Sequence, residues 1–225
     1  MKPSLNIHFV IAIAIGLSMF ISGNVHRMKN PYFQINTHTG ALPPAIQKII
    51  AGPFLGSAAD YNILQVFTLY SALNQVSDKN RQSQLWEHIK NRLTTASQQD
   101  PYFKDIYRIT SGLLAFQPGY EKTAIKILER GGKFRVWDWE SLFIAGFLAH
   151  ELINDNKLAT TLLQQSAQRP NAPPIAAGVA AKIIQQDHGS EASIRFLEQM
   201  KSTLPAEYQQ GLQQRINRIE QGEIK

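Results

Sequence analysis

Six histidines are the residues of this chain that could serve metal chemistry, and their spacing supports no known metal motif. A zinc protease requires His-Glu-x-x-His on one helix, and a di-metal helical bundle requires Glu-x-x-His pairs. Neither pattern occurs, and His150 and Glu151 are adjacent, which directs them to different faces of a helix. We therefore expect no metal site. The histidines are His8, His26, His38, His88, His150 and His188.

Nucleophiles and paired acids are equally uninformative about catalysis. The sequence has no phosphate-cradling glycine loop, no Gly-x-Ser-x-Gly elbow, no Ser-x-x-Lys signature and no cysteine. Asp138 and Glu140 could act as a general acid and base, but nothing in the pattern places a partner opposite either carboxylate. Helix capping and surface solvation are the preferred interpretation of both. The sequence thus predicts a protein without catalytic residues or a cofactor.

Two tryptophans are the most unusual feature. Trp137 and Trp139 are two positions apart, so both cannot lie on one helix face. We expect one to pack between helices and the other to face a groove, where aromatic side chains often anchor a protein partner. Further candidates for partner contact come from helices expected to line the inner surface of a stack. These are Tyr107, Thr110, His150 and Glu151.

Charge argues against nucleic acid as the partner. The formal net charge is +6, but Lys2, Arg27 and Lys29 contribute three of these charges, which leaves +3 for the rest of the chain. Nucleic-acid binding requires a concentrated basic face. The densest basic cluster, Lys126 to Arg135, surrounds a turn and is interrupted by Glu129, so we interpret it as solvated surface.

The elements that position these residues are helices. Apolar residues recur at three- and four-residue spacing, and no strand-like alternation persists. Gly146 is expected inside a helix, where a close crossing would explain its retention. The predicted helices begin near Ser57 and cover about 81–97, 102–117, 121–130, 140–152, 155–169, 174–188, 189–200 and 207–219. Asp100-Pro101 is expected to cap the third of them, and Gly131-Gly132 to end the fourth.

The helices also show an internal repeat. A turn residue followed by Ala and then Leu occurs as Gly119, Ala124 and Leu128, and again 35 residues later as Asn154, Ala159 and Leu163. A weaker copy starts at Gly189. Repeats of this length indicate stacked helical hairpins that bury their apolar faces against their neighbours.

This spacing resembles the tetratricopeptide repeat (TPR), in which the second helix carries an Ala, a bulky residue and a small residue before a boundary Pro. Ala124, Leu128 and Gly131 match it, as do Ala159, Leu163 and Ser166, followed by Pro170. The motifs at 56–60, 100–103, 128–131 and 172–174 further resemble bacterial membrane-anchored repeat proteins. The resemblance implies an all-α, TPR-like α-solenoid of antiparallel helical hairpins behind an N-terminal hydrophobic anchor helix, without an active site.

The amino terminus carries an apolar run at residues 7–21, preceded by Lys2. An uncleaved membrane anchor is preferred, and a cleaved export signal stays open because the run is shorter than the 20 or so residues of a spanning helix. The predicted parts are an anchor or signal segment at 1–29, a linker and entry segment at 30–56, and the repeat domain at 57–221. The expected location is the bacterial inner membrane, single-pass, with the body in the periplasm.

These features predict a non-enzymatic scaffold or adaptor that binds a protein partner at the cell envelope. The partner's identity and the oligomeric state are left open. One alternative is a periplasmic helical-superhelix enzyme of transglycosylase type, which would need a catalytic Glu in a cleft. Another is a membrane-anchored adaptor that faces the cytosol, with Arg27 and Lys29 holding the anchor in the opposite orientation.

Overall fold

A computed structural model describes residues 13–22 and 42–223, in two units that span residues 1–39 and 40–225. In the first unit, residues 13–22 are helical and expose their large apolar side chains. None of the helices that the structure describes combines the length and apolar character needed to cross a membrane. The predicted single-pass inner-membrane location is therefore corrected. The remaining anchor residues, 1–12 and 23–29, lie outside the described residues.

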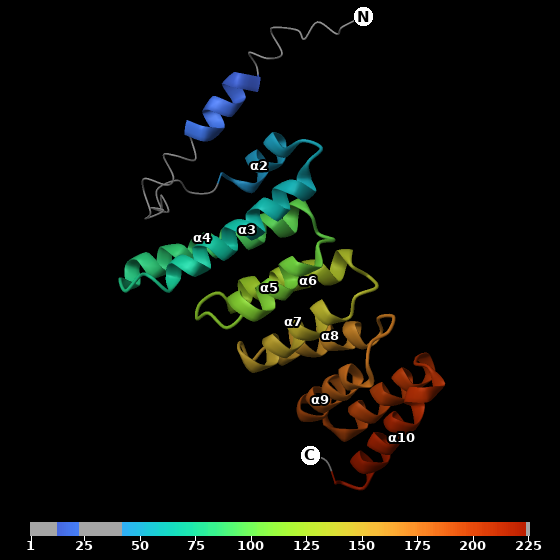
Figure 1. Ribbon diagram of the computed structural model, residues 1–225. Helices are drawn as coiled ribbons and strands as arrows, with labels where there is room; N and C mark the ends of the chain where they lie inside the picture. The colour runs from blue at the N-terminus through green and yellow to red at the C-terminus, as the bar shows by residue number, and fades with distance from the viewer. Residues whose placement is uncertain (1–12, 23–41, 224–225) are drawn as a thin grey trace, which may run out of the picture. The chain divides into compact units, whose positions relative to one another are not determined.

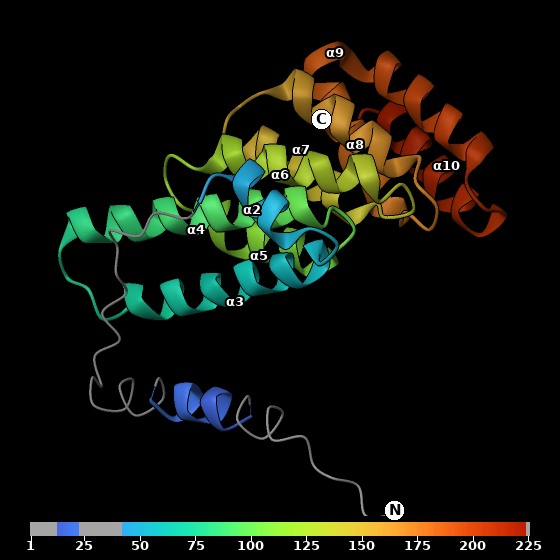
Figure 2. The same ribbon diagram turned by 90° about the horizontal axis from the view of Figure 1, so that it is seen from above.

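All regular secondary structure of the second unit within residues 42–223 is helical, so the all-α prediction is confirmed. Consecutive helices pack in adjacent pairs, such as α3 with α4, α7 with α8, and α9 with α10 (Figure 1, and Figure 2 from above). The elements are α2 (Pro44–Ala51), α3 (Leu55–Leu73), α4 (Lys79–Gln99), α5 (Lys104–Ile109), the π-helical turn η1 (Thr110–Leu114), α6 (Glu121–Phe134), α7 (Glu140–Glu151), α8 (Asn156–Ala167), α9 (Pro174–Thr203) and α10 (Ala206–Glu220).

Aspartates begin two of these helices. Asp78 accepts a hydrogen bond from the Asn80 backbone N–H at the start of α4, and Asp155 accepts one from Leu158 at the start of α8. The predicted cap at Asp100 is wrong. Asp100 ends α4, and its carboxylate binds the Tyr102 N–H within the connection, so α5 starts only at Lys104.

Two consecutive glycines also act differently from the prediction. The predicted helix end at Gly131-Gly132 is wrong, because α6 continues through both to Phe134. A Cβ atom on Gly131 would lie 2.8 Å from the Tyr107 ring, and one on Gly132 would lie 2.2 Å from Leu142 Cδ2. These glycines therefore allow α6 to approach its neighbours closely and do not end the helix.

Gly146 lies at a close crossing of α7 and α8, as expected from the sequence. A Cβ atom there would lie 2.7 Å from Leu163 Cγ and 3.1 Å from the Ala159 carbonyl oxygen. Further along, α9 bends at Gly189, whose φ of 83° and ψ of 171° are not helical. This bend falls at the predicted boundary between two helices.

The repeat positions identified in the sequence form part of the core. Ala124 and Leu128 of α6, and Ala159 and Leu163 of α8, are fully buried. Their helices, α6 and α8, both pack against α7. This packing fixes the short connections that precede α5 and α7, where the candidate site lies.

Candidate protein-binding surface

Two aromatic side chains stack on each other at the surface. Tyr102 lies in the connection between α4 and α5, and Trp137 lies in the connection between α6 and α7. Their ring centroids are 6.1 Å apart and their planes are inclined by only 4°. Tyr102 is nevertheless 55% exposed and Trp137 is 52% exposed. The two rings thus form an ordered apolar surface that remains accessible.

A nearly buried ion pair holds this surface in place. Arg135 Nε donates to Asp138 Oδ2 at 3.1 Å, and Arg135 Nη1 donates to the Tyr102 carbonyl oxygen at 2.5 Å. The same guanidinium lies 5.5 Å from the centre of the Trp137 ring. Asp138 also accepts the Glu140 N–H at 3.1 Å, at the start of α7. One arginine therefore links both aromatic connections to the beginning of a helix.

A third aromatic residue extends the surface toward α6. Phe134 meets Tyr102 edge to face at 6.0 Å, and the Arg130 guanidinium lies 4.8 Å from the centre of the Phe134 ring. We name Tyr102, Phe134 and Trp137 the aromatic edge. Aromatic rings gain from such edge-to-face and cation–π contacts beyond simple burial.

Two further arginines join consecutive hairpins beside the aromatic edge. Arg130 Nε donates to the Ser97 carbonyl at the end of α4. Arg169 donates to the carbonyls of Gly132 and Val136, at and just after the end of α6. Cations are favourable near helix carboxyl ends, where unpaired carbonyls carry partial negative charge. Neither guanidinium forms an ion pair with a carboxylate of the described residues.

The second tryptophan has a different environment. Trp139 is half-buried, packs edge to face against Phe143 at 5.7 Å, and accepts a hydrogen bond at its carbonyl from Ser166 Oγ at 2.8 Å. One tryptophan is thus more exposed and the other packs between helices. Contact of either with a partner stays a prediction.

Tyr107 and Thr110 are placed in the interior. Tyr107 is 2% exposed and its hydroxyl donates to the Pro101 carbonyl at 2.6 Å, while Thr110 is fully buried and donates to the Ile106 carbonyl. Burial raises the pKa of Tyr107 to about 12 by desolvating the phenolate, although the nearby cations Arg130 and Arg135 act in the opposite direction. Their predicted role as partner contacts is therefore corrected to packing, because three-residue spacing alone did not show which face of α5 lies inward.

His150 and Glu151 lie at the opposite end of α7 from the aromatic edge. His150 Nδ1 is 2.7 Å from Asn156 Oδ1, and Asn156 Nδ2 donates to Asp187 Oδ1 at 2.7 Å. His150 Nε2 is 3.7 Å from the exposed Glu151 carboxylate. Their distance along α7 from the aromatic edge is about 16 Å, at 1.5 Å per residue. The structure therefore does not bring these candidates into one site with Trp137.

Sequence reasoning missed Tyr102, although a signal was present. Tyr102 and Trp137 are 35 residues apart, the same interval that separates Gly119 from Asn154. Residues separated by one repeat occupy equivalent positions in consecutive hairpins and lie side by side in a stack. The interval could thus have identified Tyr102 as the neighbour of Trp137.

Nothing in the part of the chain that the structure describes groups three or more His, Asp or Glu residues suitably for a metal ion. The chain matches no family model, no curated protein and no solved structure.

Proposed function

We propose that this chain is a non-enzymatic scaffold, a TPR-like α-solenoid, that binds a protein partner through the aromatic edge. Its consecutive hairpins support the solenoid architecture, as does the burial of Ala124, Leu128, Ala159 and Leu163 at equivalent repeat positions. Repeat stacks commonly offer extended binding surfaces formed by equivalent residues of neighbouring repeats.

The observation that carries the proposal is the stacked, half-exposed pair of Tyr102 and Trp137. Such a pair exposes a large apolar area to water, although each ring would be more stable buried. The contacts of Arg135 already fix both connections, so little side-chain freedom remains to be lost on binding. Trp, Tyr and Arg are also the residue types that dominate binding energy at protein interfaces.

A protein partner suits this surface better than a nucleic acid. Arg130, Arg135 and Arg169 all donate hydrogen bonds to backbone carbonyls, which uses part of their donor capacity. Nucleic-acid binding relies on many cations that neutralise consecutive phosphates. Here a few anchored guanidinium groups flank an apolar centre, as at protein interfaces.

Site-specific cross-linking tests the proposal. A photoreactive phenylalanine analogue replaces Tyr102 in the full-length chain, and the same analogue replaces Phe116 as a matched control. Phe116 is 63% exposed and follows η1, at the far end of the hairpin. In extracts of the source cells, we expect a discrete protein adduct from position 102 that position 116 does not give. The same adducts from both positions, or none from position 102, would contradict the proposal.

A further inference from the structure

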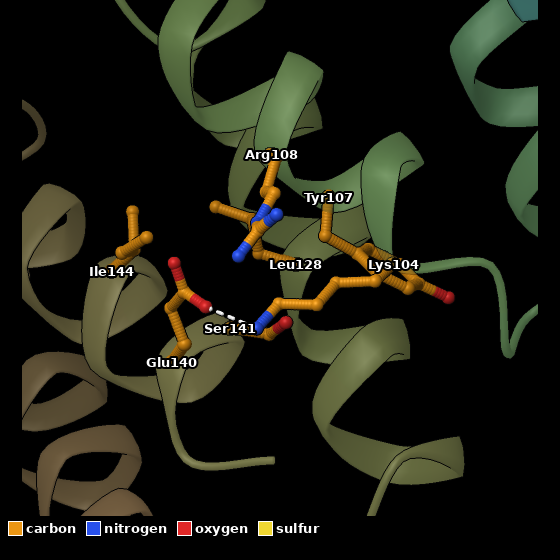
Figure 3. A pocket seen from close by; sticks show the side chains of 7 residues that line it. All are labelled: Lys104, Tyr107, Arg108, Leu128, Glu140, Ser141 and Ile144. Carbon is orange, nitrogen blue, oxygen red and sulfur yellow. Dashed lines mark ion pairs between the residues drawn. The ribbon is translucent and has the colours of Figure 1, made fainter.

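A small hollow opens between α5, α6 and α7 (Figure 3). Its empty volume is about 190 Å³, including the part open to solvent. Part of this space is open solvent, so the hollow is a shallow depression that admits only a small polar group. Leu128 and Ile144 contribute apolar walls, whereas Lys104, Arg108, Glu140 and Ser141 contribute polar groups.

Hydrogen-bond donors exceed acceptors in this hollow. Lys104 Nζ pairs with Glu140 Oε2 at 2.7 Å, which leaves two further ammonium donors. Arg108 has five donors, and its nearest carboxylate, Asp105 Oδ1, lies 3.9 Å away on an exposed surface. At that distance and exposure the pair is weak. The Tyr107 hydroxyl is not available, because it points away from the hollow and donates to the Pro101 carbonyl (Figure 3).

Ser141 adds a further hydrogen-bond donor to the hollow. It is only 3% exposed, yet its hydroxyl makes no hydrogen bond to any residue within 13–22 and 42–223. Its hydroxyl oxygen is not among the buried side-chain atoms without a partner in the described residues, so solvent in the hollow reaches it. This hydroxyl is therefore available to donate to an acceptor that enters the hollow.

We propose that the hollow binds one carboxylate of the partner segment that lies on the aromatic edge, an inference that rests on the proposed function. The carboxylate accepts hydrogen bonds from Arg108 and Ser141 Oγ, and the spare donors of Lys104 face the same space. A carboxylate supplies only acceptors, which matches the excess of donors. A cationic ligand would meet Lys104 and Arg108, while the only lining carboxylate, Glu140, is already paired.

The hollow and the aromatic edge lie within reach of one short peptide segment. Lys104 follows Tyr102 by two residues, and Glu140 follows Trp137 by three. Two residues of extended chain span about 7 Å. A partner segment is therefore expected to carry its carboxylate two to four positions from the residue that contacts the aromatic edge. The carboxylate belongs to an acidic side chain or to the end of the partner chain.

A peptide library tests this inference with the full-length protein. Ten-residue peptides selected on the wild type are resynthesised with Asp, Glu, Asn or Gln at each position, and with either a free or an amidated carboxyl end. We expect one acidic position to bind about tenfold or more tightly than its amide counterpart, which is typical of a charge-assisted hydrogen bond. Preference at an internal position assigns a side chain, whereas preference for the free end assigns a terminal carboxylate.

Two substitutions test whether the tighter binding of acidic peptides depends on the residues that line the hollow. Ser141→Ala removes a hydroxyl that has no partner, and Arg108→Gln removes an exposed cation, so we expect both variants to fold. In each variant, the ratio of the affinity for the acidic peptide to that for the amide peptide should fall toward one. The affinity for the amide peptide should stay unchanged. Arg195→Gln removes a similarly exposed cation on α9 and should retain the preference.

Two outcomes would overturn the inference. One is equal binding of acidic and amide peptides to the wild type, and the other is an acidic preference that survives both Ser141→Ala and Arg108→Gln. The variant Trp137→Ala tests the proposed function separately, because it alters the aromatic edge and leaves the residues that line the hollow in place. Acid and amide peptides should both weaken on that variant, and unchanged binding of both would contradict the use of the aromatic edge itself.

Discussion

Tyr102 and Trp137 stack with ring centroids 6.1 Å apart, although 35 residues separate them in the chain. They precede α5 and α7, the first helices of two consecutive hairpins, so stacking of the hairpins brings the two connections together. Arg135 donates to the Tyr102 carbonyl and lies against Trp137. The aromatic edge is therefore a product of how one hairpin packs on the next, and its order depends on that packing.

Removal of Asp138 should destabilise the fold. Arg135 is 9% exposed and Asp138 is 7% exposed, so Asp138→Ala leaves a nearly buried guanidinium without its carboxylate. Loss of one partner of a buried pair typically lowers the free energy of unfolding by about 3 to 5 kcal/mol. We expect about 3 kcal/mol, measured by urea denaturation followed by circular dichroism.

Asp105→Ala is the matched control, because Asp105 pairs at 3.9 Å with Arg108 and both side chains are 58% exposed. Exposed pairs contribute about 1 kcal/mol or less. If the two substitutions changed stability equally, the Arg135–Asp138 pair would not hold the aromatic edge.

Gly146→Ala should destabilise the crossing of α7 and α8. The added methyl group would lie 2.7 Å from Leu163 Cγ and near backbone atoms of α8, which cannot withdraw as a flexible side chain can. Overpacking of this kind costs about 1 to 3 kcal/mol. Thermal denaturation should therefore show a lower Tm.

Gly211→Ala in α10 provides the opposite control. No atom lies within 4 Å of a Cβ at that position, so only the helix propensity changes. Alanine favours a helix over glycine by about 1 kcal/mol, and Tm should rise. A rise in Tm with both substitutions would show that Gly146 is not needed for close packing.

Tyr107 should make stability depend on alkaline pH. Burial raises the pKa of Tyr107 to about 12 from an ordinary value near 10. A raised pKa means that the unfolded chain loses the phenolic proton first, so this contribution is complete below pH 10 and is lost as pH rises toward 12. The corresponding loss is roughly 2 to 3 kcal/mol, from about 1.4 kcal/mol per pKa unit.

To test this, the free energy of unfolding is measured between pH 9 and 12 for the wild type and for Tyr107→Phe, and the two pH dependences are compared. The variant lacks the hydrogen bond to Pro101 and should be less stable at pH 9. It should then lose less stability than the wild type as pH rises. Parallel curves would show that Tyr107 is not the group responsible.

Much of the fold was predictable because helical periodicity is a local property of the sequence. The apolar spacing gave the all-α class, and the repeat interval identified Ala124, Leu128, Ala159 and Leu163 as core positions. Gly146 was interpreted correctly since a glycine inside a helix has few explanations other than a close approach.

The errors concern contacts between segments that are distant in sequence. Gly131-Gly132 looked like a helix end, but Tyr107 and Leu142 occupy the space that side chains there would fill. Tyr107 was expected to be accessible, yet α6 covers it. Periodicity defines the faces of a helix and does not say which neighbour covers each face.

The candidate site was only half predictable for the same reason. Trp137 stood out in the sequence by its residue type. The residue types of Tyr102, Arg135 and Asp138 did not mark them as site residues, because they become neighbours only when the two connections pack together. The membrane location failed for a different reason: an apolar stretch near the minimum length was interpreted as a spanning helix, and no described helix has that capacity.

The most direct test of the account is the affinity of the partner recovered by cross-linking at position 102. Trp137→Ala should weaken its binding to the full-length chain by about 30-fold or more, the loss typical of an interface hot spot of about 2 kcal/mol. Phe116→Ala, which removes a similarly exposed aromatic side chain elsewhere, should leave the affinity unchanged. Both proteins must retain the wild-type Tm. Equal affinities for the wild type and Trp137→Ala would contradict the proposal that the aromatic edge binds the partner.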